Sequence, residues 1–116
     1  MKTIFNFSHP LGEKAKEQIT KAVGENKVCN IPVHLNLHEK LHPQMLKICH
    51  QAVTDHGQPD YIICPGHASA AVIIDRFFSR AEDDYPPITT YRPTIRLVME
   101  NSSTPPIFVL AEIWGA

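Results

Sequence analysis

The stretch KTIFNFSHPLGEKAKEQITKAVG, residues 2–24, decides the fold because it joins a strand pattern to a helix pattern. Residues 2–7 are rich in the apolar and aromatic side chains that strands favour. In residues 13–23 the apolar side chains recur at the spacing of one helix face, at Ala15, Ile19, Ala22 and Val23. Gly24 then supplies a helix stop. The stretch therefore predicts a strand followed by a helix.

The same order of patterns recurs along the chain. Strands are predicted at 27–33 and 61–65, helices at 43–53 and 67–81, and a hairpin from strands at 94–100 and 107–114. Successive strand-helix units imply a parallel sheet, because a parallel connection needs a return about as long as a helix. The sequence therefore predicts one α/β domain over residues 1–116, a small Rossmann-like three-layer sandwich with the order βαβαβα followed by a C-terminal β-hairpin.

The composition is that of an ordinary globular protein and narrows the classes of ligand. Of the 116 residues, 43% are hydrophobic and 20% are charged, and the net charge is -1 with neutral histidines. Long nucleic acid binds to basic stripes that displace many counterions, and the sequence has no such excess of Lys and Arg. A small anion, which needs only a few local cations or helix ends, is compatible with this charge.

The amino-terminal MKTIFNF has no apolar stretch typical of a signal peptide, and no apolar run approaches the roughly 20 residues that span a membrane. We therefore expect a cytoplasmic protein without a membrane segment. The three cysteines, Cys29, Cys49 and Cys64, form no CxxC pair and lie in apolar contexts. We expect them to be small buried residues.

Two loops form the candidate binding site. In an open α/β sheet, ligands bind beyond the carboxyl ends of the strands, where the strand order reverses. If the first strand is central, residues 6–12 and 64–70 face each other at that point. Gly66 permits close approach of a ligand to a helix whose first N–H groups can bind an anion. The anion site would also include the hydroxyls of Ser8 and Ser69, the imidazoles of His9 and His67, and the turn at Pro65.

Each part of this site also has a purely structural interpretation. Ser8 is a plausible helix cap, with Pro10 in the first helical turn, where its missing N–H costs nothing. The loop after residue 64 lacks both GxGxxG and GxxxxGK[ST], so neither dinucleotide binding nor a P-loop is predicted.

Arg92 and Arg96 are the best candidate cations for this site, because a guanidinium pairs with phosphate through two hydrogen bonds. The alternative for both is a solvated charge at the sheet edge.

The histidines do not predict a metal site. His34, His38 and His42 are spaced by four, but the run alternates and meets Pro43, so the three imidazoles need not converge. The chain also lacks a GxSxG elbow and an evident pair of catalytic carboxylates. We therefore expect neither a metal nor a cofactor.

Several short stretches together resemble one protein family. NFSHPL at 6–11, IPVHL and HPQML in the middle, CPGHASAA at 64–71 and PPIFVLAEI at 105–113 resemble the small accessory proteins of type III CRISPR systems placed in Csx family fifteen. The resemblance implies a CARF-like Rossmann fold that handles cyclic oligoadenylate, the second messenger made by type III complexes after they detect viral RNA. It assigns site roles to Asn6, Ser8, His9, Pro65 and Gly66. The surroundings of Arg92 are less basic than the resemblance leads us to expect.

We expect the protein to bind cyclic oligoadenylate, with cyclic tetra-adenylate the expected ring, and to temper antiviral signalling by sequestration. Phosphates would lie on amide N–H groups and arginines, and adenines would pack against side chains such as Tyr91. A homodimer or higher homo-oligomer would present the two loops to each half of the ring. The first alternative is a metal-independent ring nuclease in which His9 assists attack by the ribose 2′-OH. The second is a protein–protein adaptor.

Overall fold

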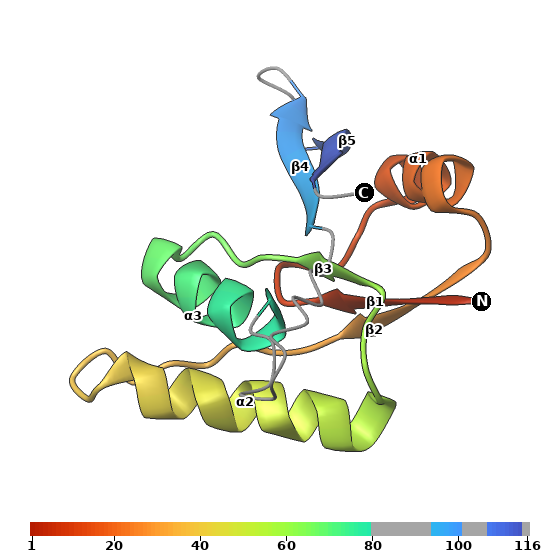
Figure 1. Cartoon of the computed structure of the whole chain (residues 1–116). Helices are drawn as coiled ribbons and strands as arrows, with labels where there is room; N and C mark the ends of the chain where they lie inside the picture. The colour runs from red at the N-terminus through yellow and green to blue at the C-terminus, as the bar shows by residue number, and fades with distance from the viewer. Residues whose placement is uncertain (80–93, 101–106, 115–116) are drawn as a thin grey trace.

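The computed structural model describes residues 1–79, 94–100 and 107–114 (Figure 1). In chain order the elements are β1 (Lys2–Asn6), α1 (Glu13–Val23), β2 (Asn26–Asn30), α2 (Leu41–His56), β3 (Tyr61–Ile63), α3 (Ala68–Ser79), β4 (Thr94–Glu100) and β5 (Ile107–Trp114). The α/β class and the predicted order of elements are confirmed. None of the helices in these ranges is long and apolar enough to cross a membrane.

The strands form one mixed sheet with the order β2-β1-β3-β4-β5. β1 pairs in parallel with β2 and β3, with Phe5 opposite Cys29 on one side and Ile62 on the other. β4 is parallel to β3, and β5 is antiparallel to β4. The first strand therefore lies between the second and the third, as the site hypothesis requires, and the carboxyl ends of β1, β2 and β3 share one edge of the sheet (Figure 1).

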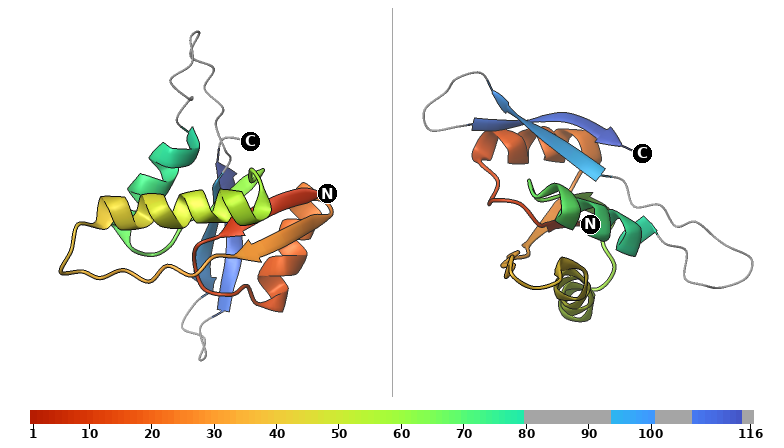
Figure 2. Two further views of the ribbon diagram at one scale, coloured as in Figure 1. Left: turned by 90° about the horizontal axis from the view of Figure 1, so that it is seen from below. Right: turned by 90° about the vertical axis from the view of Figure 1, so that its left-hand side faces the viewer.

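Helices cover both faces of the sheet, so the molecule has three layers (Figure 2). On one face, Phe5 belongs to a buried cluster with Met45 of α2 and Ile74 of α3. On the other face, Ile4 belongs to a second cluster with Ile19 of α1. Neighbouring residues of β1 thus enter opposite clusters, as expected for a strand covered on both faces. The arrangement is compatible with a Rossmann-like sandwich, although the antiparallel β5 departs from a parallel sheet.

The beginnings of the first two helices correct the sequence analysis. α1 has the predicted bounds, but its N-cap is Gly12, which makes no side-chain cap hydrogen bond. Ser8 lies well before this cap, so the interpretation of Ser8 as a helix cap is wrong. α2 begins at Leu41 rather than at residue 43, because Pro43 occupies the first turn, where a helix needs no N–H. The predicted helix stop at Gly24 is confirmed, and Gly57 ends α2 in the same way. Their φ angles are 87° and 78°, a backbone conformation that residues other than glycine rarely adopt.

Smaller differences concern strand ends and one helix face. β2 ends at Asn30, shortly before Pro32, which has no N–H to donate to a strand ladder. β3 spans only Tyr61–Ile63, because the chain turns toward α3 directly afterwards. In α1 the predicted inward stripe holds for Ala15 and Ile19, which are buried, but Ala22 is exposed.

The hairpin matches its predicted bounds and lies alongside α1 (Figure 2). Inward and outward side chains alternate at the start of β4, since Ile95 is 1% exposed and the neighbouring Arg96 is exposed. A β-bulge at Ala111 falls between the pairs Arg96 with Glu112 and Leu97 with Leu110. The Leu110 N–H donates to Gln18 Oε1 at 2.8 Å, which fixes β5 to α1. The hairpin therefore adds a wall beside the loop that precedes α1.

Candidate functional site

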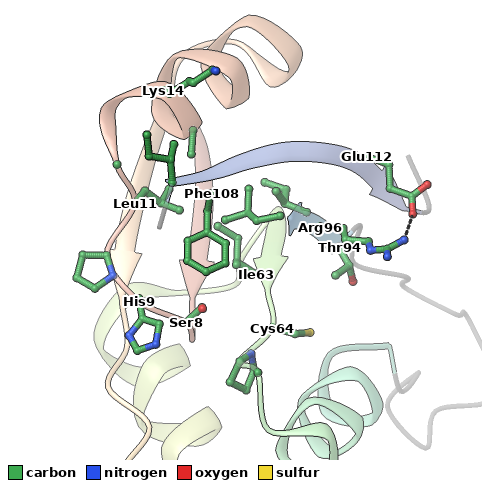
Figure 3. A pocket seen from close by; sticks show the side chains of 18 of the residues that line it. Ser8, His9, Leu11, Lys14, Ile63, Cys64, Thr94, Arg96, Phe108 and Glu112 are labelled. Atoms are coloured by element: carbon green, nitrogen blue, oxygen red, sulfur yellow. Dashed lines mark hydrogen bonds and ion pairs between the residues drawn. The ribbon is translucent and has the colours of Figure 1, made fainter. Parts of the chain in front are cut away.

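The two predicted loops adjoin at the carboxyl edge of the sheet. The Phe7 N–H donates to the Ile63 carbonyl at 3.0 Å, so the chain leaving β1 stays bonded to the end of β3. Both loops line one pocket of about 850 Å³, and the hairpin lines a third side of it (Figure 3). The residues that the two loops place in this pocket include Ser8, His9, Pro65 and Gly66. Small-molecule sites have volumes of roughly 300–1,000 Å³. The predicted meeting of the two loops is therefore confirmed.

One wall of this pocket is apolar. Leu11, Ile63 and Ile95 line it, and Phe108 projects into it from β5 (Figure 3). Phe108 is 42% exposed, so part of its ring is open to a ligand. Aromatic and apolar surface of this kind accepts flat heteroaromatic groups, because every nucleobase has a π face that can stack. The sequence analysis did not select Phe108, whose only signal was an aromatic side chain at the start of a strand pattern.

Asn6 holds the β1–α1 loop in shape. Its side chain is fully buried; Nδ2 donates to the His9 carbonyl at 2.9 Å and to Asn30 Oδ1 at 3.0 Å, and Oδ1 accepts the Ser8 N–H at 3.0 Å. Both N–H donors of the amide are thus used inside the protein. The resemblance assigned Asn6 to the ligand, but its contacts make it a positioning residue that presents Ser8 and His9.

Ser8 and His9 reach the pocket as predicted. Ser8 is half-buried, and within the described ranges its hydroxyl makes no hydrogen bond to protein. His9 is exposed at the mouth, on the same side as Ser8 (Figure 3). A hydroxyl and an imidazole are therefore available to an acceptor such as a phosphate oxygen.

The start of α3 has fewer backbone N–H groups available to an anion than predicted. His67 is the residue before α3, and its Nδ1 accepts the Ala70 N–H at 3.3 Å, while its carbonyl accepts the Ala71 N–H at 2.9 Å. One of the first helical amides is therefore occupied by the imidazole, which acts as a cap. Ser69 is exposed and lines neither this pocket nor the second one described below, so its predicted ligand role is unsupported.

Two basic side chains of the described residues line this pocket, Lys14 of α1 and Arg96 of β4, and Arg96 is held in an ion pair. Arg96 Nη1 lies 3.1 Å from Glu112 Oε1 at the rim of the pocket, with the two side chains 65% and 44% exposed (Figure 3). Arg96 thus lines the pocket, but its charge is paired with the Glu112 carboxylate. This arrangement resembles the alternative interpretation, in which Arg96 is a solvated charge at the edge of the sheet. The predicted Tyr91 and Arg92 lie outside the described residues.

A second hollow, of about 550 Å³, adjoins the first at the ends of β1, β2 and β3. The two hollows share Ser8, His9, Pro10, Pro65 and Gly66. Asn30 and His34 line only the second hollow, and so does His67. The sequence analysis missed Asn30, although a polar residue in the apolar strand pattern KVCNIPV was a usable signal.

The histidines of the middle segment do not converge on a metal. Within the described ranges, no group of three or more His, Cys, Asp or Glu residues could hold a metal ion. His38 and His42 are exposed, and the His38 N–H donates to Asn36 Oδ1 at 3.0 Å, which stabilises a turn rather than a helix. His34 and His38 lie in the segment before α2 and His42 lies in α2, so the three imidazoles do not share one helix face.

Cys29 and Cys49 are buried as predicted, whereas Cys64 is only partly buried and lines the pocket. Burial, together with the negative charge of Asp75, raises the pKa of the Cys64 thiol to about 11.

At about pH 7.5 we expect roughly two orders of magnitude less thiolate at Cys64 than in an ordinary thiol. Alkylation of Cys64 by iodoacetamide, followed by peptide mass spectrometry, should therefore be slow and accelerate up to about pH 11. Asp75→Asn should raise the rate at neutral pH, and rapid labelling of the unaltered protein there would contradict the assignment.

The chain matches no protein family, no curated protein and no solved structure. The resemblance to type III CRISPR accessory proteins therefore stays a prediction, and the chemistry of the site follows from its own geometry.

Proposed function

We propose that this protein is a CARF-like module that binds cyclic oligoadenylate, with cyclic tetra-adenylate the expected ring, and tempers type III CRISPR signalling by holding the messenger. The observation that carries the proposal is the meeting of the loops after β1 and β3 at one pocket. Such a crevice, beyond the carboxyl ends of adjacent parallel strands, is where open α/β sheets bind nucleotides and related ligands.

The pocket offers one surface for phosphate and another for a base. Ser8, His9 and the open backbone at Gly66 stand on the polar side, where a hydroxyl, an imidazole and amide groups can donate to phosphate oxygens. Leu11 and Phe108 stand on the apolar side, where stacking of a base contributes about 1–3 kcal/mol. A ligand that carries both groups, such as an adenylate, suits this division.

A homo-oligomer suits the proposed ligand better than a single copy. Cyclic tetra-adenylate carries four phosphates around a compact ring, whereas the cations that the described residues bring to one crevice are Lys14 and an Arg96 that is already paired. Two copies related by a two-fold axis would present the same loops to opposite halves of the ring. Mixing with the ligand should therefore yield a complex with more than one protein copy per ring.

Calorimetric titration with cyclic tetra-adenylate, followed by chromatography of the recovered ligand, tests the proposal. We expect saturable binding and an intact ring. Linear or halved products would establish a ring nuclease instead. Absence of binding would overturn the proposal and leave a protein–protein adaptor.

The ring nuclease is the second candidate because exposed His9 stands in the crevice and shares the second hollow with His67. In that reaction the ribose 2′-oxygen bonds to phosphorus and the bond from phosphorus to the 5′-oxygen breaks. The proton leaves the 2′-OH, and the 5′-oxygen takes up a proton; an imidazole can assist either transfer. If turnover is found, His9→Ala should abolish it while retaining much of the affinity.

Removing the partner of Arg96 should strengthen binding of a polyanion. Glu112→Gln deletes the carboxylate 3.1 Å from the guanidinium, and we expect affinity for cyclic tetra-adenylate to rise by about threefold to tenfold at low salt. Folding stability should change by less than about 1 kcal/mol, because the pair is exposed. Glu25→Gln makes the same charge change beside the amino end of β2 and serves as the control in parallel calorimetric titrations. Equal affinities for the two variants would exclude Arg96 from the site.

A further inference from the structure

The two hollows adjoin each other. Both are lined by Ser8, His9 and Pro10 from the β1–α1 loop and by Pro65 and Gly66 from the β3–α3 loop, and we call these shared residues the ridge. A group seated on this ridge touches the mouths of both hollows. A ligand with two bulky groups joined by a small polar linker therefore fits the surface better than a ligand with one.

The second hollow has its own recognition chemistry. Val33 and Leu35 supply apolar wall, and both are half-buried. His34 and His67 add imidazoles at its border. Its volume of about 550 Å³ lies within the range of small-molecule sites, roughly 300–1,000 Å³. The hollow is thus large enough for one nucleoside-sized group.

Asn30 gives this hollow a donor of fixed orientation. Asn6 and Asn30 are register partners at the carboxyl ends of β1 and β2, and Asn6 Nδ2 donates to Asn30 Oδ1 at 3.0 Å. Because Asn6 is fully buried and holds its own loop, it determines which side of the Asn30 amide is the acceptor. Within the described ranges, Asn30 Nδ2 has no hydrogen bond and belongs to an exposed residue that lines the hollow. It is available to a ligand acceptor.

We propose that the second hollow is a subsite for the second nucleotide unit of the ligand. The linking phosphate lies on the ridge at Ser8 and Gly66, one base packs near Phe108, and the other base enters the second hollow and accepts a hydrogen bond from Asn30. Adenine suits this position because its ring nitrogens are acceptors on an otherwise flat surface. The inference rests on the proposed function, since it names how that site would recognise two adjacent adenylate units.

Calorimetry with AMP and with the linear dinucleotide pApA tests the subsite. We expect the unaltered protein to bind pApA at least about tenfold more tightly than AMP, because only the dinucleotide fills both hollows. Asn30→Asp retains an acceptor for Asn6 but replaces the donor by a carboxylate. In that variant the advantage of pApA over AMP should disappear, with AMP affinity little changed and the thermal midpoint preserved.

Gln58→Glu provides the matched charge control, because it adds the same negative charge to an exposed residue before the amino end of β3, at the opposite edge of the sheet. It should keep the advantage of pApA. Equal binding of AMP and pApA by the unaltered protein, or an unchanged advantage in Asn30→Asp, overturns the subsite even if cyclic tetra-adenylate binds. Failure of cyclic tetra-adenylate, AMP and pApA alike overturns the proposed function as well.

Discussion

Gly66→Asp is expected to lower the affinity for cyclic tetra-adenylate by at least about a hundredfold while leaving the fold intact. The ridge residue Gly66 faces both hollows, so a carboxylate there meets the phosphate that the ridge is proposed to seat. Juxtaposed like charges cost several kcal/mol, and a hundredfold loss corresponds to only about 2.7 kcal/mol. Calorimetric titration measures the loss, and circular dichroism melting checks the fold.

The backbone at Gly66 makes this substitution a clean test. A Cβ atom built at Gly66 meets no other atom within 4 Å, and its φ is not in the left-handed region. A side chain is therefore accommodated without strain. Gly66→Asn, which has nearly the same size without the charge, is the matched control and should retain most of the affinity. If Gly66→Asp binds as tightly as Gly66→Asn, the phosphate does not lie on this ridge.

Asn6→Ala is expected to lower the free energy of unfolding by about 3 kcal/mol. The substitution leaves the Ser8 N–H and the His9 carbonyl without their partner, and an unsatisfied buried polar group costs about 1–3 kcal/mol. The Asn30 amide also loses the contact that orients it. Urea denaturation should show a lower midpoint with an unchanged slope, and the remaining folded protein should bind pApA more weakly because the loop loses its support.

Asn26→Ala is the control for this stability prediction. Asn26 Nδ2 also donates two hydrogen bonds, to Thr20 Oγ1 at 3.1 Å and to the Gly24 carbonyl at 2.9 Å, but both are exposed to solvent. Water can replace them, so the loss should stay below about 1 kcal/mol. Similar losses for Asn6→Ala and Asn26→Ala would contradict the assignment of Asn6 as the residue that organises the loop.

The sequence predicts the fold well where turn signals delimit a pattern. The bounds of α1, β4 and β5 agree with the prediction, because Gly24 marks the end of α1 and the turn-rich NSSTPP separates β4 from β5 in the sequence. The ends of β2 and β3 could not be predicted as well, since they depend on where the chain turns away from the neighbouring strand. α2 began earlier than expected because Pro43 is compatible with a first helical turn.

The site was predictable in position and less so in its individual contacts. Strand order alone brings the loops after β1 and β3 together, so Ser8 and Gly66 could be paired from the sequence. Whether a polar side chain faces the ligand or the protein depends on tertiary contacts that leave no periodic signal. Asn6 turns inward to the loop, and His67 caps its own helix. Arg96 meets Glu112 only because the bulge at Ala111 sets their register.

The most direct test of the central claim follows backbone amide resonances of the isotopically labelled protein during titration with cyclic tetra-adenylate. A polyanion seated between the two loops should shift the amides of Ser8, His9, Gly66 and His67 in a saturable manner, and leave those beside Glu25 and Gln58 at the opposite edge nearly unchanged. No saturable shift, or shifts confined to residues remote from both loops, would contradict a nucleotide site in this crevice.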